Sequence, residues 1–156
     1  MRIEQELDIA APIDAVWAFL TDLPAVSRCV PGASDIEPLA ADTVGGTIEV
    51  RVGPIGVRMI GRVRLAEANA TEHRAALEIE ATDRRIGGGM TAHTTFVARP
   101  ADGSTETTRL SVATDATLTG RLGQFGQPII RRKSEELSKQ FAENVAAALA
   151  DPAKAG

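Results

Sequence analysis

One stretch of the sequence has the residue types of a phosphate-binding loop: the pair Arg84-Arg85 is followed closely by three glycines at 87–89. A phosphate loop places its glycines directly before a helix N-terminus and usually ends in Gly-Lys-Ser or Gly-Lys-Thr. Here a strand-like run from Met90 to Val97 follows instead. We therefore predict that the glycines form a hairpin or bulge between two strands, where they let a sheet bend sharply.

Other side chains able to carry out catalysis or bind a metal are few. His73 and His93 are the only histidines; the first follows a predicted turn and is expected to be solvated, and the second lies in a predicted strand. No His-Glu-x-x-His spacing indicates a metal site, and no Gly-x-Ser-x-Gly elbow indicates a nucleophile. Cys29, the sole cysteine, is expected to be a small packed side chain rather than a reactive thiol. We predict no catalytic residue and no metal site.

The totals indicate the class of protein. The 156 residues suit one domain, which we place at 1–150 with a short tail at 151–156. A net charge of −4 argues against a general nucleic-acid surface. The N-terminus is acidic where a secretory signal is apolar, and no run approaches the roughly 18 apolar residues of a membrane span. We therefore expect a cytoplasmic protein.

The aromatic content is low. The chain has four Phe, one Trp and no Tyr, although aromatic side chains supply much of the volume of most cores. A core built from Ala, Gly, Val and Thr is incompletely filled, and a void that persists is a place for a ligand.

The hydrophobic periodicity predicts the elements that surround such a void. Alternation over residues 2–9 predicts a strand, Pro12 begins a helix that ends near Asp22, and a second short helix runs to Cys29. About six further strands are expected between Ala33 and Thr119. Apolar residues at every fourth position predict a long helix from Pro128 to Ala150, which either starts there or is joined at a kink by an earlier turn. Strands in hairpin order form an antiparallel sheet, and the helix must cover its apolar face.

This α+β order resembles the START-like helix-grip fold (SRPBCC superfamily), in which a curved antiparallel sheet of about seven strands wraps a long C-terminal helix and two short helices follow the first strand. Three segments are similar to the G-subunit family of carbon monoxide dehydrogenase: VWAFLTDLPAVSRCVPGASDIE, VGPIGVRMIGRVRL and GRLGQFGQPIIRRKSEELSKQFAENV. The resemblance covers nearly the whole chain.

The resemblance implies a non-enzymatic protein that binds an apolar molecule between sheet and helix, menaquinone, another quinone or a lipid. It implies an accessory or adaptor role for a carbon monoxide dehydrogenase-type molybdenum hydroxylase, with peripheral contact at the inner face of the cell membrane. Many members carry a further C-terminal tail thought to reach the membrane; this sequence stops at Gly156, so we do not expect direct anchoring.

A bent sheet diverges from a straight helix at one end, and Gly61, Ala75, Ala81 and Ala116 are too small to close that gap. Residues on the two short helices form its rim. Each aliphatic position can equally be ordinary core, but as a group they predict a ligand-binding set: Trp17, Val26, Val30, Met59, Gly61, Leu77, Ile79, Phe96, Phe125, Ile129 and Leu137.

Two other functions fit the same fold. A polyketide cyclase or dehydratase-like enzyme needs His, Asp or Arg inside the cavity, whereas a pure protein-interaction module has a fully packed core. The basic run 131–133 is interpreted as a solvated helix face that pairs with Glu135 and Glu136. Its alternative is contact with an acidic partner or anionic lipid, a contact that Arg84 and Arg85 could also make.

Overall fold

The computed structural model describes residues 1–150; the predicted tail at 151–156 lies outside the described residues. Seven strands and three α-helices follow the predicted order. The strands are β1 (Arg2–Ile9), β2 (Ala33–Ala40), β3 (Thr43–Val52), β4 (Ile55–Asn69), β5 (Arg74–Asp83), β6 (Gly88–Pro100) and β7 (Thr108–Gly120). The helices are α1 (Ile13–Leu20), α2 (Leu23–Ser27) and α3 (Gln127–Ala150), with short 3₁₀ turns η1 (Ala101–Gly103) and η2 (Arg121–Gln124).

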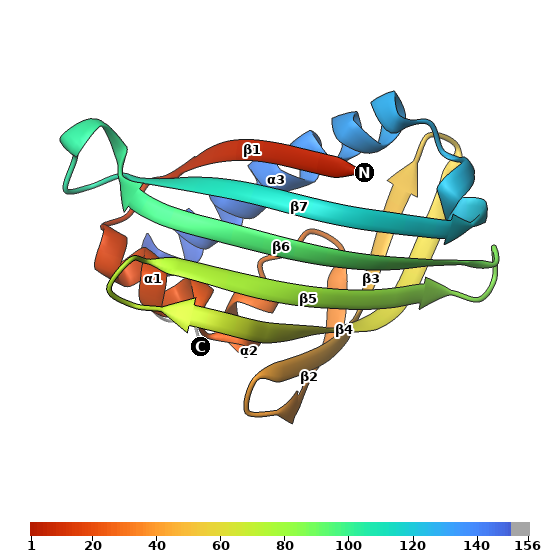
Figure 1. Cartoon of the computed structure of the whole chain (residues 1–156), viewed down its shortest axis with the longest axis horizontal. Coiled ribbons are helices and arrows are strands. Elements are labelled where there is room, and N and C mark those ends of the chain that lie inside the picture. Colours follow the sequence, from red (N-terminus) through yellow and green to blue (C-terminus); the bar gives the residue numbers. More distant parts are fainter. Residues whose placement is uncertain (151–156) are drawn as a thin grey trace.

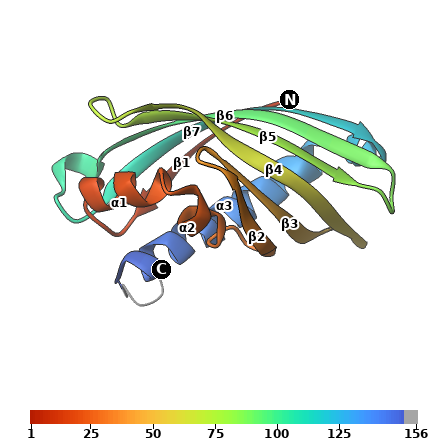
Figure 2. The same cartoon turned by 90° about the horizontal axis from the view of Figure 1, so that it is seen from below.

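All strands join one antiparallel sheet in the order β1-β7-β6-β5-β4-β3-β2. Strands β2 to β7 are joined by successive hairpins. The last strand, β7, pairs with β1, so the first and last strands lie side by side (Figure 1). The sheet curves over α3 and the two short helices (Figure 2). This confirms the predicted α+β architecture.

The triple glycine lies in the β5–β6 hairpin, as predicted. Gly87 has a φ of +70° in the turn, and Gly88 and Gly89 begin β6 opposite Gly120 and Thr119. A side chain at Gly88 would come within 2.9 Å of Leu122 Cγ, so the glycine lets η2 pack closely against the sheet. No helix follows the glycines, which removes the geometric basis for a phosphate loop.

Local signals explain the helix boundaries. The Asp22 carboxylate accepts a hydrogen bond from the Ala25 N–H at 3.3 Å and caps α2, with Pro24 in the first turn. Helix α3 begins where Ile129 and Ile130 both donate to the Gly126 carbonyl at 3.1 Å. Of the two predicted alternatives for this region, the start near Pro128 is confirmed, because α3 begins at Gln127 with Pro128 in its first turn. The earlier turn is present as η2, but the extended backbone of Phe125 separates it from the helix.

Two apolar clusters hold the sheet against the helices. The larger joins α1, α2 and the C-terminal half of α3 to the sheet, and Ile9, Val16, Ala75 and Val145 are completely buried in it. The smaller is formed by Val52, Val57 and Leu122, with partly buried neighbours that include Met59 and Phe125. On α3 the buried residues are Ala142, Val145 and Ala148, all in its C-terminal half. The N-terminal half of α3 therefore packs less closely, as expected for a straight rod beneath a bent sheet.

No helix within residues 1–150 combines the length and the apolar character that crossing a membrane requires.

Candidate ligand-binding site

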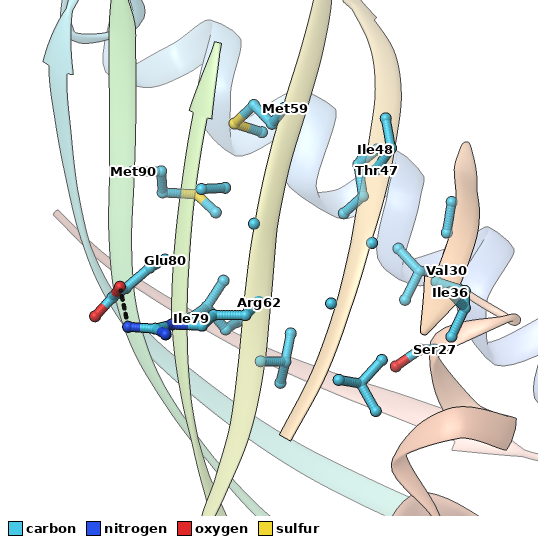
Figure 3. A pocket seen from close by; sticks show the side chains of 17 residues that line it. Ser27, Val30, Ile36, Thr47, Ile48, Met59, Arg62, Ile79, Glu80 and Met90 are labelled. Atoms are coloured by element: carbon cyan, nitrogen blue, oxygen red, sulfur yellow. Dashed lines mark hydrogen bonds and ion pairs between the residues drawn. The ribbon is translucent and has the colours of Figure 1, made fainter. Parts of the chain in front are cut away.

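A small apolar pocket opens on the concave side of the sheet. It lies where β3, β4 and β5 face α2 and the beginning of β2 (Figure 3). Its volume is about 80 Å³. The side chains that form most of its wall are Val30, Ile36, Ile48, Met59, Ile79 and Met90. Its lining is almost wholly hydrocarbon, which suits an apolar molecule or an apolar part of one.

Glycines let the strands curve beneath the pocket. Gly46 on β3 and Gly61 on β4 are paired with each other, and Gly61 is paired with Ala81 on β5. A side chain on Gly61 would lie 2.0 Å from the Glu80 carbonyl oxygen and 2.7 Å from the Ala81 Cα. Gly61 is therefore required by the close approach of two backbones. From the sequence we expected its small size to leave an unfilled gap, and the structure supplies this different reason.

The concave face stays partly open beyond the pocket. Five inward-facing residues between the two apolar clusters are only half-buried, two of them at the pocket wall, whereas Ala92 among them is buried; the five are Ile79, Ala81, Thr94, Thr114 and Ala116. We call these residues the open strip. Ala75, which was predicted to leave space, is completely buried in the larger cluster and is not part of it. The prediction for Ala75 is wrong because α1 and α2 cover that end of the sheet.

The open strip contains one polar pair. Thr94 Oγ1 and Thr114 Oγ1 lie 2.9 Å apart on neighbouring strands, and either hydroxyl can be the donor. Their mutual hydrogen bond uses one hydroxyl proton and leaves the other available. A ligand acceptor on the concave face can accept that second proton.

Ionisable side chains are nearly absent from the concave face. Among the inward-facing positions of β1 and β3 to β7, only Asp83 is ionisable. Its side chain is 1% exposed, and both of its oxygens accept backbone N–H bonds. These hydrogen bonds lower the pKa of Asp83 below its ordinary value, and the bond from the Arg58 N–H has the largest effect. Asp83 is therefore a structural cap.

The histidines and the cysteine lie away from the pocket. His93 is exposed on the convex face. His73 is less solvated than predicted: its side chain is 26% exposed, because its ring packs against that of Trp17 in a T-shaped arrangement with the ring centroids 5.5 Å apart. Cys29 is buried as predicted, and burial raises the pKa of its thiol. Residues 1–150 contain no group of three or more His, Cys, Asp or Glu arranged to hold a metal ion.

The structure brings together four of the predicted ligand-binding residues: Val30, Met59, Gly61 and Ile79 line the pocket. The remaining seven lie elsewhere. Trp17, Val26, Leu77 and Phe96 belong to or pack against the larger cluster, Phe125 packs against the smaller one, Leu137 is half-buried on α3, and Ile129 is 44% exposed.

Sequence reasoning missed Ile36, Ile48 and Met90 as pocket residues. A usable signal existed for Ile48. The Gly53-Pro54 turn implies that Val52 pairs with Ile55, and counting back along both strands pairs Ile48 with Met59. No comparable local signal exists for Ile36, because β2 has register shifts that its sequence does not reveal.

Known proteins share both the sequence pattern and the fold. The family described as the carbon monoxide dehydrogenase G subunit (CoxG) matches residues 6–150. No curated protein matches the chain significantly.

Solved structures share the fold at low sequence identity. A conserved protein from Geobacillus kaustophilus is similar with a TM-score of 0.84 and 15% identity, covering 96% of this chain and 95% of that one. A START superfamily protein from Mycobacterium smegmatis has a TM-score of 0.65 and 13% identity, with 95% and 96% covered. Norcoclaurine synthase from Thalictrum flavum has a TM-score of 0.64 and 13% identity, with 98% and 96% covered. At such identities these structures establish a START-like fold and nothing about chemistry.

Proposed function

Because this chain belongs to the CoxG family of carbon monoxide dehydrogenase proteins, we propose that it is a non-enzymatic carrier of an apolar molecule, a quinone such as menaquinone or a lipid. Family and fold together support a ligand-binding protein of the START-like superfamily. We further propose that it serves as an accessory or adaptor protein of a carbon monoxide dehydrogenase-type molybdenum hydroxylase, the partner that the family name indicates.

One observation supports the carrier function above all: the concave face is partly open, apolar and almost free of ionisable side chains. The pocket wall is almost wholly hydrocarbon, and the two charged residues at its border, Arg62 and Glu80, pair with each other at 3.2 Å (Figure 3). The only ionisable inward-facing residue on the strands β1 and β3 to β7 is Asp83, whose oxygens accept hydrogen bonds from backbone N–H groups. Burying apolar ligand surface there is favourable by roughly 25 cal/mol per Å². A cyclase or dehydratase needs groups that move protons, and the described strands offer none free to do so on this face.

The pocket size constrains how the ligand binds. At about 80 Å³ the pocket is smaller than the roughly 150 Å³ cavity that accommodates benzene in an engineered protein. A bicyclic quinone ring therefore requires the site to widen. The N-terminal half of α3, where no residue is buried, is the element that can move with the least loss of packing.

The Thr94–Thr114 pair supplies the polar contact. A quinone has carbonyl oxygens that accept hydrogen bonds, and the spare hydroxyl proton of this pair is the donor that the open strip presents. The ring lies over the threonines in this arrangement, and the isoprenoid chain extends along the hydrocarbon wall toward Met59.

The experiment is native mass spectrometry of the protein purified gently from its own cells, combined with lipid extraction. A bound quinone or lipid at a stoichiometry near one is expected. In parallel, a short-chain menaquinone is titrated while the fluorescence of Trp17, the single tryptophan, is followed. Repeated absence of any apolar ligand, with no saturable response to the menaquinone, would refute the carrier function.

The adaptor role has its own test. The tagged full chain is used to recover a molybdenum hydroxylase from the same cells, with the enzyme's CO- or aldehyde-oxidising activity as the readout. Recovery of the activity supports the role. A protein that carries quinone but recovers no such enzyme is a carrier without this partner.

A further inference from the structure

Three segments far apart in the sequence meet at one end of the molecule. They are the β3–β4 hairpin (51–58), the β5–β6 hairpin (84–88) and the segment from the end of β7 through η2 into α3 (119–133), which lie together at the right of Figure 1. The smaller apolar cluster joins all three. The Arg121 N–H also donates to the Gly87 carbonyl at 2.8 Å. We call this surface the basic end.

The basic end has a charge opposite to that of the rest of the chain. Eight of the 17 Lys and Arg residues and none of the 21 Asp and Glu residues lie in its three segments, which leaves nine basic residues against 21 acidic ones elsewhere. The eight are Arg51, Arg58, Arg84, Arg85, Arg121, Arg131, Arg132 and Lys133. All seven arginines are exposed. Because the chain as a whole is acidic, this concentration of positive charge gives the molecule a strong charge asymmetry along its length.

Only part of this positive charge is neutralised by neighbouring carboxylates. Three of the eight cations have an acidic partner: Arg58 pairs with Glu49 at 3.0 Å, Arg85 lies 3.7 Å from Asp83, and Lys133 lies 3.7 Å from Glu136. The Asp83 oxygens already accept backbone N–H bonds, so Arg85 shares that carboxylate with stronger partners.

The other cations keep their charge available. Within residues 1–150, Arg84, Arg131 and Arg132 make no ion pair, so the predicted pairing of the basic run occurs between Lys133 and Glu136 but not with Glu135. These exposed guanidinium groups are free to contact an external anion.

Exposed aliphatic side chains lie among the arginines. Ile55 at the tip of the β3–β4 hairpin is 41% exposed, and Ile129 in the first turn of α3 is 44% exposed. Both lie within a few residues of arginine: Ile55 between Arg51 and Arg58, and Ile129 just before Arg131. Protruding aliphatic side chains beside basic groups suit the boundary between lipid headgroups and acyl chains, whereas an acidic protein surface would leave the isoleucines in contact with charge.

We propose that the basic end docks on the surface of a bilayer rich in anionic phospholipid, with its arginines on the headgroup phosphates and Ile55 and Ile129 inserted shallowly. Docking itself does not require a ligand, but its use rests on the proposed carrier function. Met59 packs against the smaller cluster and also lines the pocket. An apolar molecule that leaves the bilayer at this end thus has a short route past Met59 to the concave face.

The test uses the full chain and sedimentation with vesicles that contain no quinone, made either of phosphatidylcholine alone or with one third phosphatidylglycerol. We expect binding to the anionic vesicles only, and weaker binding as salt rises. The double variant R131Q/R132Q should bind about thirtyfold more weakly, the factor for two surface charges. The double variant I55S/I129S should also bind more weakly while keeping the salt dependence.

The matched control is R62Q/R64Q, which removes two exposed arginines from the convex face of β4, where they pair with Glu80 and Glu78. It should bind like the wild type. Equal binding to neutral and anionic vesicles, or equal loss in the control, overturns the proposal. The proposal is also overturned if the wild type binds no vesicle and R131Q/R132Q no longer recovers the enzyme partner, because the basic end is then a protein-docking surface. If the protein binds anionic vesicles but takes up no quinone, the carrier function is refuted and the docking proposal stands.

Discussion

The Asp83 carboxylate joins the two hairpins of the basic end: it accepts a hydrogen bond from the Arg58 N–H on β4 at 2.8 Å and another from the Arg85 N–H in its own turn at 2.9 Å. A fully covered carboxylate engaged by backbone donors is stabilised in its charged form. This buried acid therefore has a structural role, which is to hold the β5–β6 turn against β4.

The substitution Asp83→Asn should lower Tm at neutral pH by several degrees. The pKa of Asp83 is lower in the folded than in the unfolded protein, so its stabilisation is complete above the unfolded value of about 4 and is lost as pH falls toward the native pKa. Thermal unfolding from pH 7 to pH 3 should show a shallower decline for the variant than for the wild type. Asp35→Asn, at an exposed position, is the control. Parallel pH profiles for Asp83→Asn and wild type would contradict this assignment.

The substitution Met59→Trp should fill the pocket. Because Met59 lines a space that is not closed, we expect a loss of stability below the about 1–3 kcal/mol that overpacking a filled core costs. Binding of the short-chain menaquinone should be abolished. Ile60→Trp, one residue along β4 and 58% exposed on the opposite face, should leave both properties unchanged. A severely destabilised Met59→Trp protein would show that the pocket has no room to accept a ring.

The substitution Gly61→Ala should destabilise the protein by about 1–3 kcal/mol, because the new methyl group meets the backbone of Glu80 and Ala81 rather than a flexible side chain. The measurement is the midpoint of urea unfolding. Gly56→Ala, on the same strand with no atom within 4 Å of the added carbon, should be neutral or slightly stabilising. Equal effects at the two glycines would mean that β4 and β5 do not approach as closely as described.

The double substitution T94V/T114V tests the polar contact, because a single valine leaves the other threonine with a hydroxyl proton to donate. Loss of one neutral hydrogen bond to a ligand carbonyl should weaken menaquinone binding about fivefold to tenfold. Binding of a long-chain hydrocarbon without a carbonyl should not change. Because both partners are removed together, the stability of the double variant should stay near the wild-type value. Thr94→Val alone should keep its quinone affinity, because Thr114 still has a hydroxyl proton to donate. Unchanged quinone affinity in the double variant would exclude the threonine pair as the donor.

Much of the architecture follows from local sequence. Alternating apolar residues specify the strands, the Gly53-Pro54 turn specifies which residues of β3 and β4 face each other, and Asp22 with Pro24 specifies the start of α2. These signals act over a few residues, since they depend on backbone geometry and side-chain period alone. The antiparallel sheet, the two short helices and the long helix could therefore be predicted.

The site was predicted only in part, because alternation identifies the side of the sheet on which a residue lies but not what covers it. Ile79 and Ala75 share the inward side of β5, yet one lines the pocket and the other is completely buried. The difference arises from where α1 and α2 sit along the strand.

By itself, the sequence determined the order and type of the elements, the inward side of the regularly alternating strands and the scarcity of catalytic groups. The tertiary structure alone decided which inward residues remain open, that Gly61 is required by a backbone contact, and that arginines from three distant segments meet at one end. The physical reason is that sheet curvature and the angle of α3 result from packing summed over the whole chain, and no short stretch of sequence contains them.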